Sequence, residues 1–195
     1  MSRASKRSDL LEKGRELVHE AGFSATSVAD IAEAAGAPKG SFYNHFKSKD
    51  DFGHAVLDHF FEDVRAALAE TLHAGEEPAL ARLRKYFTRL RNYVGQDDFA
   101  RGCLIGNISA EVASVSASTR ERLSQLISEW TASLARCVED GQRDGSIRSD
   151  VTADALAGML LDAWQGALLR AKVERLPTAL DNFLEILLPT LATRR

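Results

Sequence analysis

Cysteine, proline and long apolar runs are all scarce in this sequence of 195 residues. The two cysteines, Cys103 and Cys137, are too few for a disulfide framework and lack the spacing of a metal site. No apolar run approaches the roughly 20 residues of a membrane-spanning helix, and no signal-peptide stretch follows the basic start. The sequence therefore predicts a globular, cytoplasmic protein with reduced thiols.

An excess of positive charge is also missing, since the formal net charge is −3. Residues 1–49, however, carry 8 Lys and Arg against 6 Asp and Glu, and the rest of the chain carries 17 against 22. The stretch from Pro38 to Lys49 contains three lysines and no acid. Because DNA phosphates attract basic surfaces, this uneven distribution keeps a nucleic-acid partner possible for the N-terminal part.

The apolar residues recur at helical spacing along almost the whole chain, and strand-like alternation is absent. The pattern predicts an all-α fold of about nine helices. Their approximate ranges are 9–21, 27–35, 38–46, 49–72, 79–94, 103–113, 118–141, 152–173 and 177–191. The connecting loops have the short lengths that compact helical proteins prefer.

Capping signals mark several of these helix ends. Ser27 with Asp30, and Ser48 with Asp51, have the spacing of capping boxes, in which two side chains satisfy the first free backbone N–H groups. Ser118 is the expected cap of the helix that ends near Gly141. Gly22 and Gly36 follow helices as C-cap residues.

Two short helices joined by a tight glycine-containing turn, over residues 26–49, have the pattern of a helix-turn-helix. The second helix packs through Phe42 and Phe46, which leaves a polar face suited to the major groove of DNA. That face carries Lys39, Gly40, Ser41, Tyr43, Asn44 and His45. Lys39 is expected to reach a base acceptor, whereas Tyr43, His45, Lys49 and the Ser27 hydroxyl and N–H are expected to contact phosphates.

The segment from Thr26 to Lys49, with its Gly40, its Phe-Tyr-x-His-Phe core and its closing Lys-Ser-Lys, resembles the signature of the TetR family of one-component regulators. The resemblance implies a homodimer that binds operator DNA. It implies a DNA-binding domain at residues 1–48 and an effector-binding and dimerisation domain at residues 49–195. The implied function is a repressor that a small effector releases from DNA.

An alternative from another class is a helical enzyme or adaptor that keeps the helix-turn-helix only as scaffold. The sequence shows no nucleophile–base pairing, no phosphate loop and no metal triad, so no catalytic residue, cofactor or metal is expected. His54 and Asp58 are spaced as a metal pair, but a third ligand is not apparent and a solvated helix face is the simpler interpretation.

Cys103 stands at the expected start of a helix, two residues after Arg101. Free backbone N–H groups and a nearby cation both favour the reactive thiolate, whereas Cys137, in mid-helix, lacks the helix-terminus effect. The alternative is that Cys103 is a buried structural thiol, which is common for free cysteine.

Residues 101–113 and 164–175 resemble a branch of the family that includes the N-ethylmaleimide-sensing repressor and acrylate-responsive regulators. In that branch a cysteine at the position of Cys103 is implicated in sensing electrophiles or oxidants. Further candidates for an effector site are Asn107, Trp130, Trp164, Gln165 and Lys172, although the aromatic ones also suit a plain core.

The last two expected helices, at about 152–173 and 177–191, carry more apolar residues than one buried stripe needs. Surplus apolar surface at helical spacing predicts a four-helix interface between two copies of the chain. Such a dimer would present two recognition helices about 34–36 Å apart, the spacing of successive major grooves.

Overall fold

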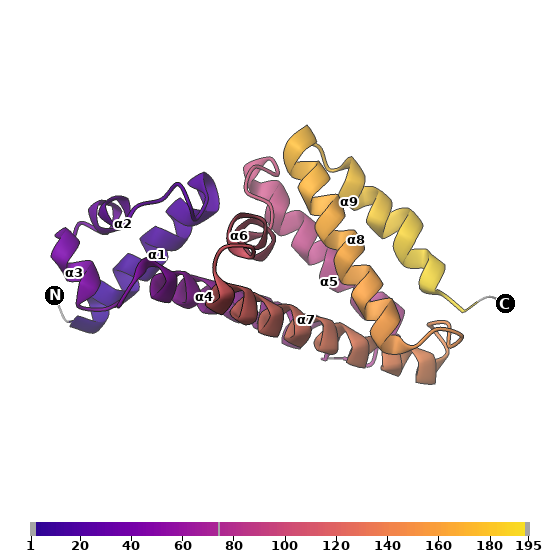
Figure 1. Cartoon of the computed structure of the whole chain (residues 1–195). Coiled ribbons are helices and arrows are strands. Elements are labelled where there is room, and N and C mark those ends of the chain that lie inside the picture. Colours follow the sequence, from indigo (N-terminus) through magenta and orange to yellow (C-terminus); the bar gives the residue numbers. More distant parts are fainter. Residues whose placement is uncertain (1–2, 74, 194–195) are drawn as a thin grey trace. The chain divides into compact units, whose positions relative to one another are not determined.

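The computed structural model describes residues 3–73 and 75–193, and side chains from Lys6 onward. Within these residues the chain forms nine α-helices and no β-strand, which confirms the predicted all-α fold (Figure 1). The helices are α1 Arg3–Ala21, α2 Val28–Ala34, α3 Lys39–Tyr43, α4 Lys49–Leu72, α5 Ala79–Val94, α6 Leu104–Val112, α7 Ala117–Asp144, α8 Ala153–Glu174 and α9 Thr178–Asn182. None of the described helices combines the length and the apolar content that crossing a membrane requires.

The helices divide into two compact units. Unit 1 contains the described residues up to Asp63 together with Leu104–Gln125, and unit 2 contains Val64–Cys103 together with the described residues from Leu126 onward. Both α6 and the beginning of α7 therefore belong to the unit that holds the helix-turn-helix.

In unit 1 the first three helices and the start of α4 enclose an aromatic core. Phe42, Phe46 and Phe52 are buried, and their ring centroids lie 5.1 to 5.5 Å apart. Burying each ring fully stabilises the fold by roughly 1.5–3 kcal/mol. Since α3 has only five residues, this packing, rather than its own hydrogen bonds, determines where it lies.

Several predicted helix ends are confirmed. Ser27 Oγ accepts from the Asp30 N–H at 3.2 Å, and the Asp30 carboxylate accepts from the Ser27 N–H at 2.8 Å, so the capping box at the start of α2 is complete. Gly22 and Gly36 follow α1 and α2 with φ of 94° and 58°, the left-handed conformation that favours glycine.

Other ends differ from the prediction. Helix α1 begins at Arg3 rather than near Asp9. At the start of α4 the Asp51 N–H donates to Ser48 Oγ, but the Asp51 carboxylate accepts from Lys47 N–H rather than from Ser48. The expected capping box there is therefore shifted by one residue.

The prediction for α7 was wrong at both ends. Its cap is Ser116, whose Oγ accepts from the Thr119 N–H at 3.3 Å, and Ser118 plays no such part. The helix continues past Gly141 to Asp144. A Cβ at Gly141 would lie 2.5 Å from the Ile147 side chain, so this glycine permits close packing and does not end the helix.

In unit 2, helices α8 and α9 lie side by side (Figure 1). Phe87 of α5, Trp164 of α8 and Phe183 pack ring against ring, with centroids 4.7 to 5.2 Å apart. The expected last helix is less regular than predicted: α9 is followed by a wide π turn at Phe183–Leu187 and a 3-10 turn at Leu188–Leu191. Pro189 lacks an N–H to donate, which is consistent with the loss of α-helical bonding there.

Candidate DNA-binding surface and effector site

Helix α3 buries one face and exposes the other. Phe42 has no exposed surface, whereas Lys39, Gly40, Tyr43 and Asn44 are exposed, and Ser41 and His45 are half-buried. Tyr43 is 55% exposed, although its ring meets Phe42 edge-on at 5.4 Å. The six residues predicted to face DNA therefore all retain accessible surface around one short helix.

The structure also shows what holds Ser27 and Lys49. The Ser27 N–H is taken by Asp30, so only its hydroxyl proton remains to meet a phosphate, in contrast to the expected use of both groups. Lys49 Nζ donates to the Ser24 carbonyl at 3.2 Å and lies 4.7 Å from the centre of the Phe23 ring. An ammonium group has three protons, so Lys49 can keep the Ser24 contact while donating to a phosphate.

The loop before α2 is held from two sides. The Glu111 carboxylate of α6 accepts from the Ser24 N–H at 2.7 Å, while Lys49 binds the Ser24 carbonyl. Sequence reasoning missed Glu111, because it lies 87 residues from Ser24 and nothing in the local pattern links the two.

Cys103 is the residue directly before α6, as predicted, and it is 8% exposed. The Gln165 side chain of α8 donates from Nε2 to Cys103 Sγ at 3.4 Å. Two of the predicted effector residues, 62 positions apart, are thus brought together by the packing of unit 2. Arg101, which was expected to favour the thiolate, pairs instead with Asp97 at 2.6 Å, so its charge is largely balanced.

The other effector candidates take different positions. Trp130 is 2% exposed and donates from Nε1 to Tyr86 Oη at 2.7 Å. Trp164 packs against the rings of Phe87 and Phe183 in unit 2. Asn107 lies one turn along α6 and is half-buried. Lys172 is half-buried on α8, two turns beyond Gln165 and on the same helix face.

Tyr86 and Trp130 form a buried polar pair in unit 2. Burial raises the pKa of the Tyr86 hydroxyl, although the hydrogen bond from Trp130 acts against that rise. Tyr86 and Trp130 therefore form a neutral pair at physiological pH, well suited to a protein interior.

Cys137 differs from Cys103. It has no exposed surface, its Sγ lies 3.7 Å from the Ala79 carbonyl oxygen, and burial raises the pKa of its thiol to about 11. A thiol with that pKa is protonated at neutral pH and a poor nucleophile.

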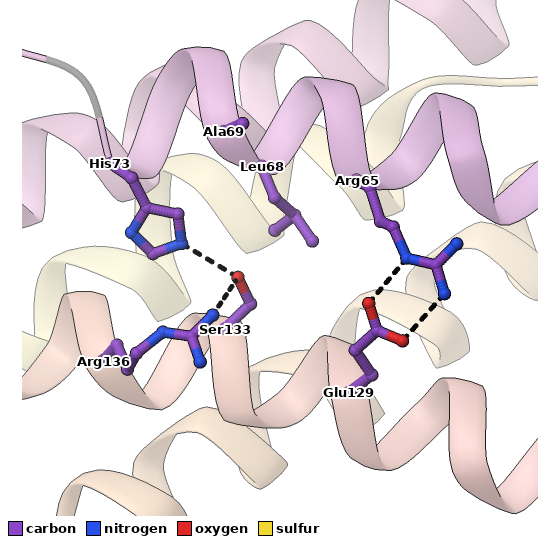
Figure 2. A pocket seen from close by; sticks show the side chains of 7 residues that line it. All are labelled: Arg65, Leu68, Ala69, His73, Glu129, Ser133 and Arg136. Atoms are coloured by element: carbon purple, nitrogen blue, oxygen red, sulfur yellow. Dashed lines mark hydrogen bonds and ion pairs between the residues drawn. The ribbon is translucent and has the colours of Figure 1, made fainter.

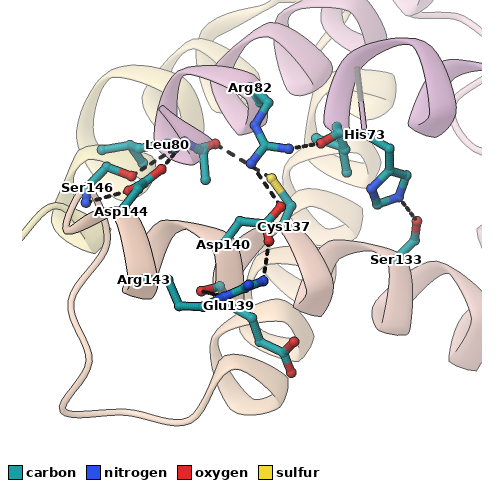
Figure 3. Close-up of polar contacts among 12 residues, drawn as sticks. His73, Leu80, Arg82, Ser133, Cys137, Glu139, Asp140, Arg143, Asp144 and Ser146 are labelled. Atoms are coloured by element: carbon teal, nitrogen blue, oxygen red, sulfur yellow. Dashed lines mark hydrogen bonds and ion pairs between the residues drawn. The ribbon is translucent and has the colours of Figure 1, made fainter. Parts of the chain in front are cut away.

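A polar network around Arg82 surrounds Cys137, and sequence reasoning did not find it (Figure 3). The Arg82 guanidinium is buried, donates to the Leu72 carbonyl at the end of α4 and pairs with Asp140 at 2.9 Å. The Asp144 carboxylate accepts from the N–H groups of Ala79 and Ser146. Burial acts to raise the pKa of Asp144, but the hydrogen bond from the Ser146 side chain and those from the two N–H groups outweigh burial and hold the pKa below its ordinary value. The network ties α4, α5 and α7 together.

His54 and Asp58, which are spaced as a possible metal pair, each contact another side chain instead. His54 lies 3.3 Å from Thr119 Oγ1, and the Asp58 carboxylate binds the Arg122 guanidinium. Among the residues that the structure describes, no group of three His, Cys, Asp or Glu side chains is placed to hold a metal ion.

Helices α8 and α9 leave an apolar groove on the surface of unit 2. It encloses about 290 Å³ and is lined by Ala163, Ala167, Ala179, Asn182, Phe183, Ile186 and Leu187. Five large apolar side chains of this region are also exposed, by 43% to 76%: Met159, Leu169, Val173, Leu176 and Ile186. This is the surface predicted to pair with a second copy of the chain.

Comparison with known families and proteins agrees with this architecture. Residues 10–56 match the bacterial regulatory proteins of the tetR family, and residues 79–187 match the tetracyclin repressor-like C-terminal domain. The HTH-type transcriptional repressor DhaR of Mycobacterium sp. strain GP1 is 41% identical over 191 residues, which cover 98% of this chain and 94% of DhaR. The HTH-type transcriptional repressor NemR of Escherichia coli K12 is 31% identical, over 91% of this chain and 89% of NemR.

Solved structures show the same likeness in three dimensions. The regulatory protein TetR from Rhodobacter sphaeroides superposes with a TM-score of 0.89 at 31% identity, over 95% of this chain and 98% of that one. The reduced form of Escherichia coli NemR also superposes with a TM-score of 0.89, at 29% identity, over 97% and 98% of the two chains. These matches confirm both the family predicted from residues 26–49 and the branch predicted from residues 101–113 and 164–175. The chain belongs to the TetR family of transcriptional regulators.

Proposed function

We propose that this protein is a transcriptional repressor that binds operator DNA through α3 and leaves the DNA when a small electrophile or oxidant modifies Cys103. Regulators of the TetR family bind operator DNA and act as dimers, and relatives over nearly the full length are regulators rather than enzymes. The observation that carries the effector proposal is the position of Cys103 directly before α6, because the N-terminal end of a helix favours the reactive thiolate.

The DNA-binding surface is assigned to α3 and its flanks. Lys39, Gly40, Ser41 and Asn44 are proposed to face the base edges, because they are polar or small and lie on the accessible side of the helix. Tyr43, His45, Lys49 and the Ser27 hydroxyl are proposed to bind phosphates, which position the helix without reading sequence. In this proposal residues 1–48 form the DNA-binding domain and residues 49–195 the effector-binding and dimerisation domain.

The dimer is proposed to form through α8, α9 and the turns that follow. The exposed apolar side chains and the groove there would be covered by the same surface of a second copy, as two-fold symmetry requires. Two copies present two α3 helices, and these would occupy successive major grooves.

Release from DNA is proposed to begin with covalent modification of the thiol. The Cys103 thiolate adds to the electron-poor carbon of an activated alkene, a carbon–sulfur bond forms, and the displaced π electrons take up a proton from water. The added group must fit where a side chain that is 8% exposed now packs. Overpacking of this kind costs about 1–3 kcal/mol and so can shift α6 against its neighbours.

A reversibly bound apolar effector, with Cys103 as a structural thiol, is the second candidate. The low exposure of Cys103 and its hydrogen bond with Gln165 favour it, because both are expected of a satisfied buried thiol.

Replacement of Cys103 separates the two candidates. Binding to DNA from upstream of the protein's own gene is measured by fluorescence anisotropy before and after treatment with N-ethylmaleimide. The wild-type protein should lose affinity about tenfold or more, the scale of a typical coupling free energy, whereas Cys103→Ser and Cys103→Ala should keep it. Cys137→Ala is the matched control and should respond as the wild type does. A Cys103 variant that still leaves DNA on treatment would rule out the thiol as sensor and support the reversible effector.

A further inference from the structure

Besides the groove at α8 and α9, unit 2 contains a hollow between the last turns of α4 and the middle of α7 (Figure 2). It encloses about 160 Å³. Three of its side chains are basic, one is acidic, one is a hydroxyl and two are apolar: Arg65, His73, Arg136, Glu129, Ser133, Leu68 and Ala69. From this geometry we propose that the hollow is a binding site for a small oxyanion, a phosphate or carboxylate group, held by Arg136 and Ser133.

The charges of the hollow are not balanced along its length. At one end Arg65 meets Glu129 through two parallel contacts, Nε–Oε1 at 2.6 Å and Nη2–Oε2 at 2.8 Å, so these two groups neutralise each other (Figure 2). At the other end Arg136 donates only to the neutral Ser133 Oγ, at 3.4 Å. Within the described part of the chain, no carboxylate lies within ion-pair distance of Arg136.

Ser133 provides a second donor. It is 5% exposed, and its Oγ lies 3.0 Å from His73 Nε2 as well as near Arg136. Elsewhere on the same two helices, the hydroxyls of Thr71 and Thr131 donate to the carbonyl four residues before them. Ser133 makes no such contact. When His73 Nε2 and Arg136 both donate to its oxygen, the Ser133 proton is left for a ligand in the hollow.

His73 reports the positive potential of this site. Burial lowers the pKa of its imidazole, and the nearby Arg136 and Arg82 lower it further, against a smaller opposite effect of Asp140. A bound anion would reverse part of that effect. Since an oxyanion is much smaller than the hollow and accepts several hydrogen bonds, Arg136 and Ser133 can bind it together.

The test uses the full-length protein without DNA, so its result does not depend on the proposed function. Inorganic phosphate and, separately, acetate replace chloride at constant ionic strength, and the imidazole NMR signals of His73 are followed, with assignment by His73→Asn. A saturable shift with either anion supports the site, and the anion that saturates identifies its chemical class. Arg136→Gln should weaken that binding about tenfold, as expected for loss of one charge-assisted hydrogen bond.

Arg143→Gln is the matched control. Arg143 lies two turns further along α7, pairs with Asp140 and does not line the hollow, so its loss should leave the affinity unchanged. A shift that never saturates with either anion, or equal weakening in both variants, would overturn the proposal. Arg136 and Arg143 are both exposed, so the variants should fold, and their melting temperatures verify this.

Discussion

At the scale of single residues, Phe42 determines how the proposed DNA-binding surface is presented. A five-residue helix has almost no stability of its own, so α3 keeps its orientation because Phe42 is fully buried against Phe46 and Phe52. The side chains on either side of Phe42 then face outward by helix geometry alone. The polar residues proposed to read DNA therefore depend on an apolar residue that never touches it.

Two lysines near α3 are expected to contribute differently to DNA binding. Lys49→Ala removes a phosphate contact, so affinity should fall about equally for all sequences, and the slope of log K against log salt should decrease by about 1. Lys39→Ala removes a proposed base contact, so the ranking of operator variants should change. Anisotropy titrations over a panel of operators and salt concentrations measure both effects.

The control for this pair is Lys85→Ala, because Lys85 is an exposed lysine of α5 in unit 2. It should bind every operator as the wild type does. Because Lys49 also holds the Ser24 carbonyl, its variant must melt near the wild-type temperature for the comparison to count. Equal loss on all sequences with Lys39→Ala would contradict the assignment of Lys39 to a base.

At the scale of helices, the capping box of α2 makes the stability of the helix-turn-helix depend on pH. The hydrogen bonds from Ser27, first from its side chain and then from its backbone, hold the pKa of Asp30 below its ordinary value of 3.8. A carboxylate with a lowered folded-state pKa stabilises the fold above its unfolded pKa. That stabilisation is lost as the pH falls through the folded value.

Asp30→Asn should therefore lower the melting temperature at pH 7, and the difference from wild type should shrink as the pH falls below the ordinary pKa of 3.8, until the carboxyl is protonated in both states. Thermal melts followed by circular dichroism at a series of pH values measure this. Glu33→Gln, a change of an exposed acid on the same helix, should show no such pH-dependent difference. A constant offset for Asp30→Asn at all pH values would show that the carboxylate charge is not involved.

The helix ends show which boundaries local sequence can predict. The Ser27–Asp30 box and the left-handed Gly22 and Gly36 follow from interactions within one turn, and they are confirmed. Gly141 was misread as a helix end because its actual role, close contact with Ile147, depends on the loop that follows α7. The cap of α7 was misplaced by two residues because Ser116 and Ser118 are equally good caps by local rules.

At the scale of the whole molecule, the apolar surface on α8 and α9 exceeds what one chain can bury. Ile186 is 65% exposed and lines the groove between these helices. An exposed apolar patch of this kind marks an interaction surface, and the family of dimeric regulators to which the chain belongs makes a second copy the natural occupant.

Ile186→Glu should consequently give a folded monomer, because two like charges would face each other across a two-fold interface and lose their hydration. Light scattering coupled to size-exclusion chromatography measures the mass, and operator affinity should fall with it. Val115→Glu is the control, since Val115 is even more exposed, at 78%, and belongs to unit 1 rather than to α8 or α9. If Ile186→Glu remained dimeric, another surface would have to form the interface.

The sequence by itself determined the all-α class, the order of the helices and the helix-turn-helix, because these depend on spacings within one or two helical turns. The family followed from the resemblance of residues 26–49 to a known signature. It also predicted which side of α3 is polar, since Phe42 and Phe46 identify the buried side. The position of Cys103 directly before a helix followed from the same local rules.

Only the tertiary structure decided which distant side chains meet. Gln165 reaches Cys103 across 62 positions, Trp130 reaches Tyr86 across 44, and Glu111 reaches Ser24 across 87. Arg136 and His73 likewise share a hollow although they belong to different parts of the chain. The physical reason is that periodicity specifies which face of a helix is buried, whereas the packing of side chains between helices sets which turn of one helix lies against which turn of another.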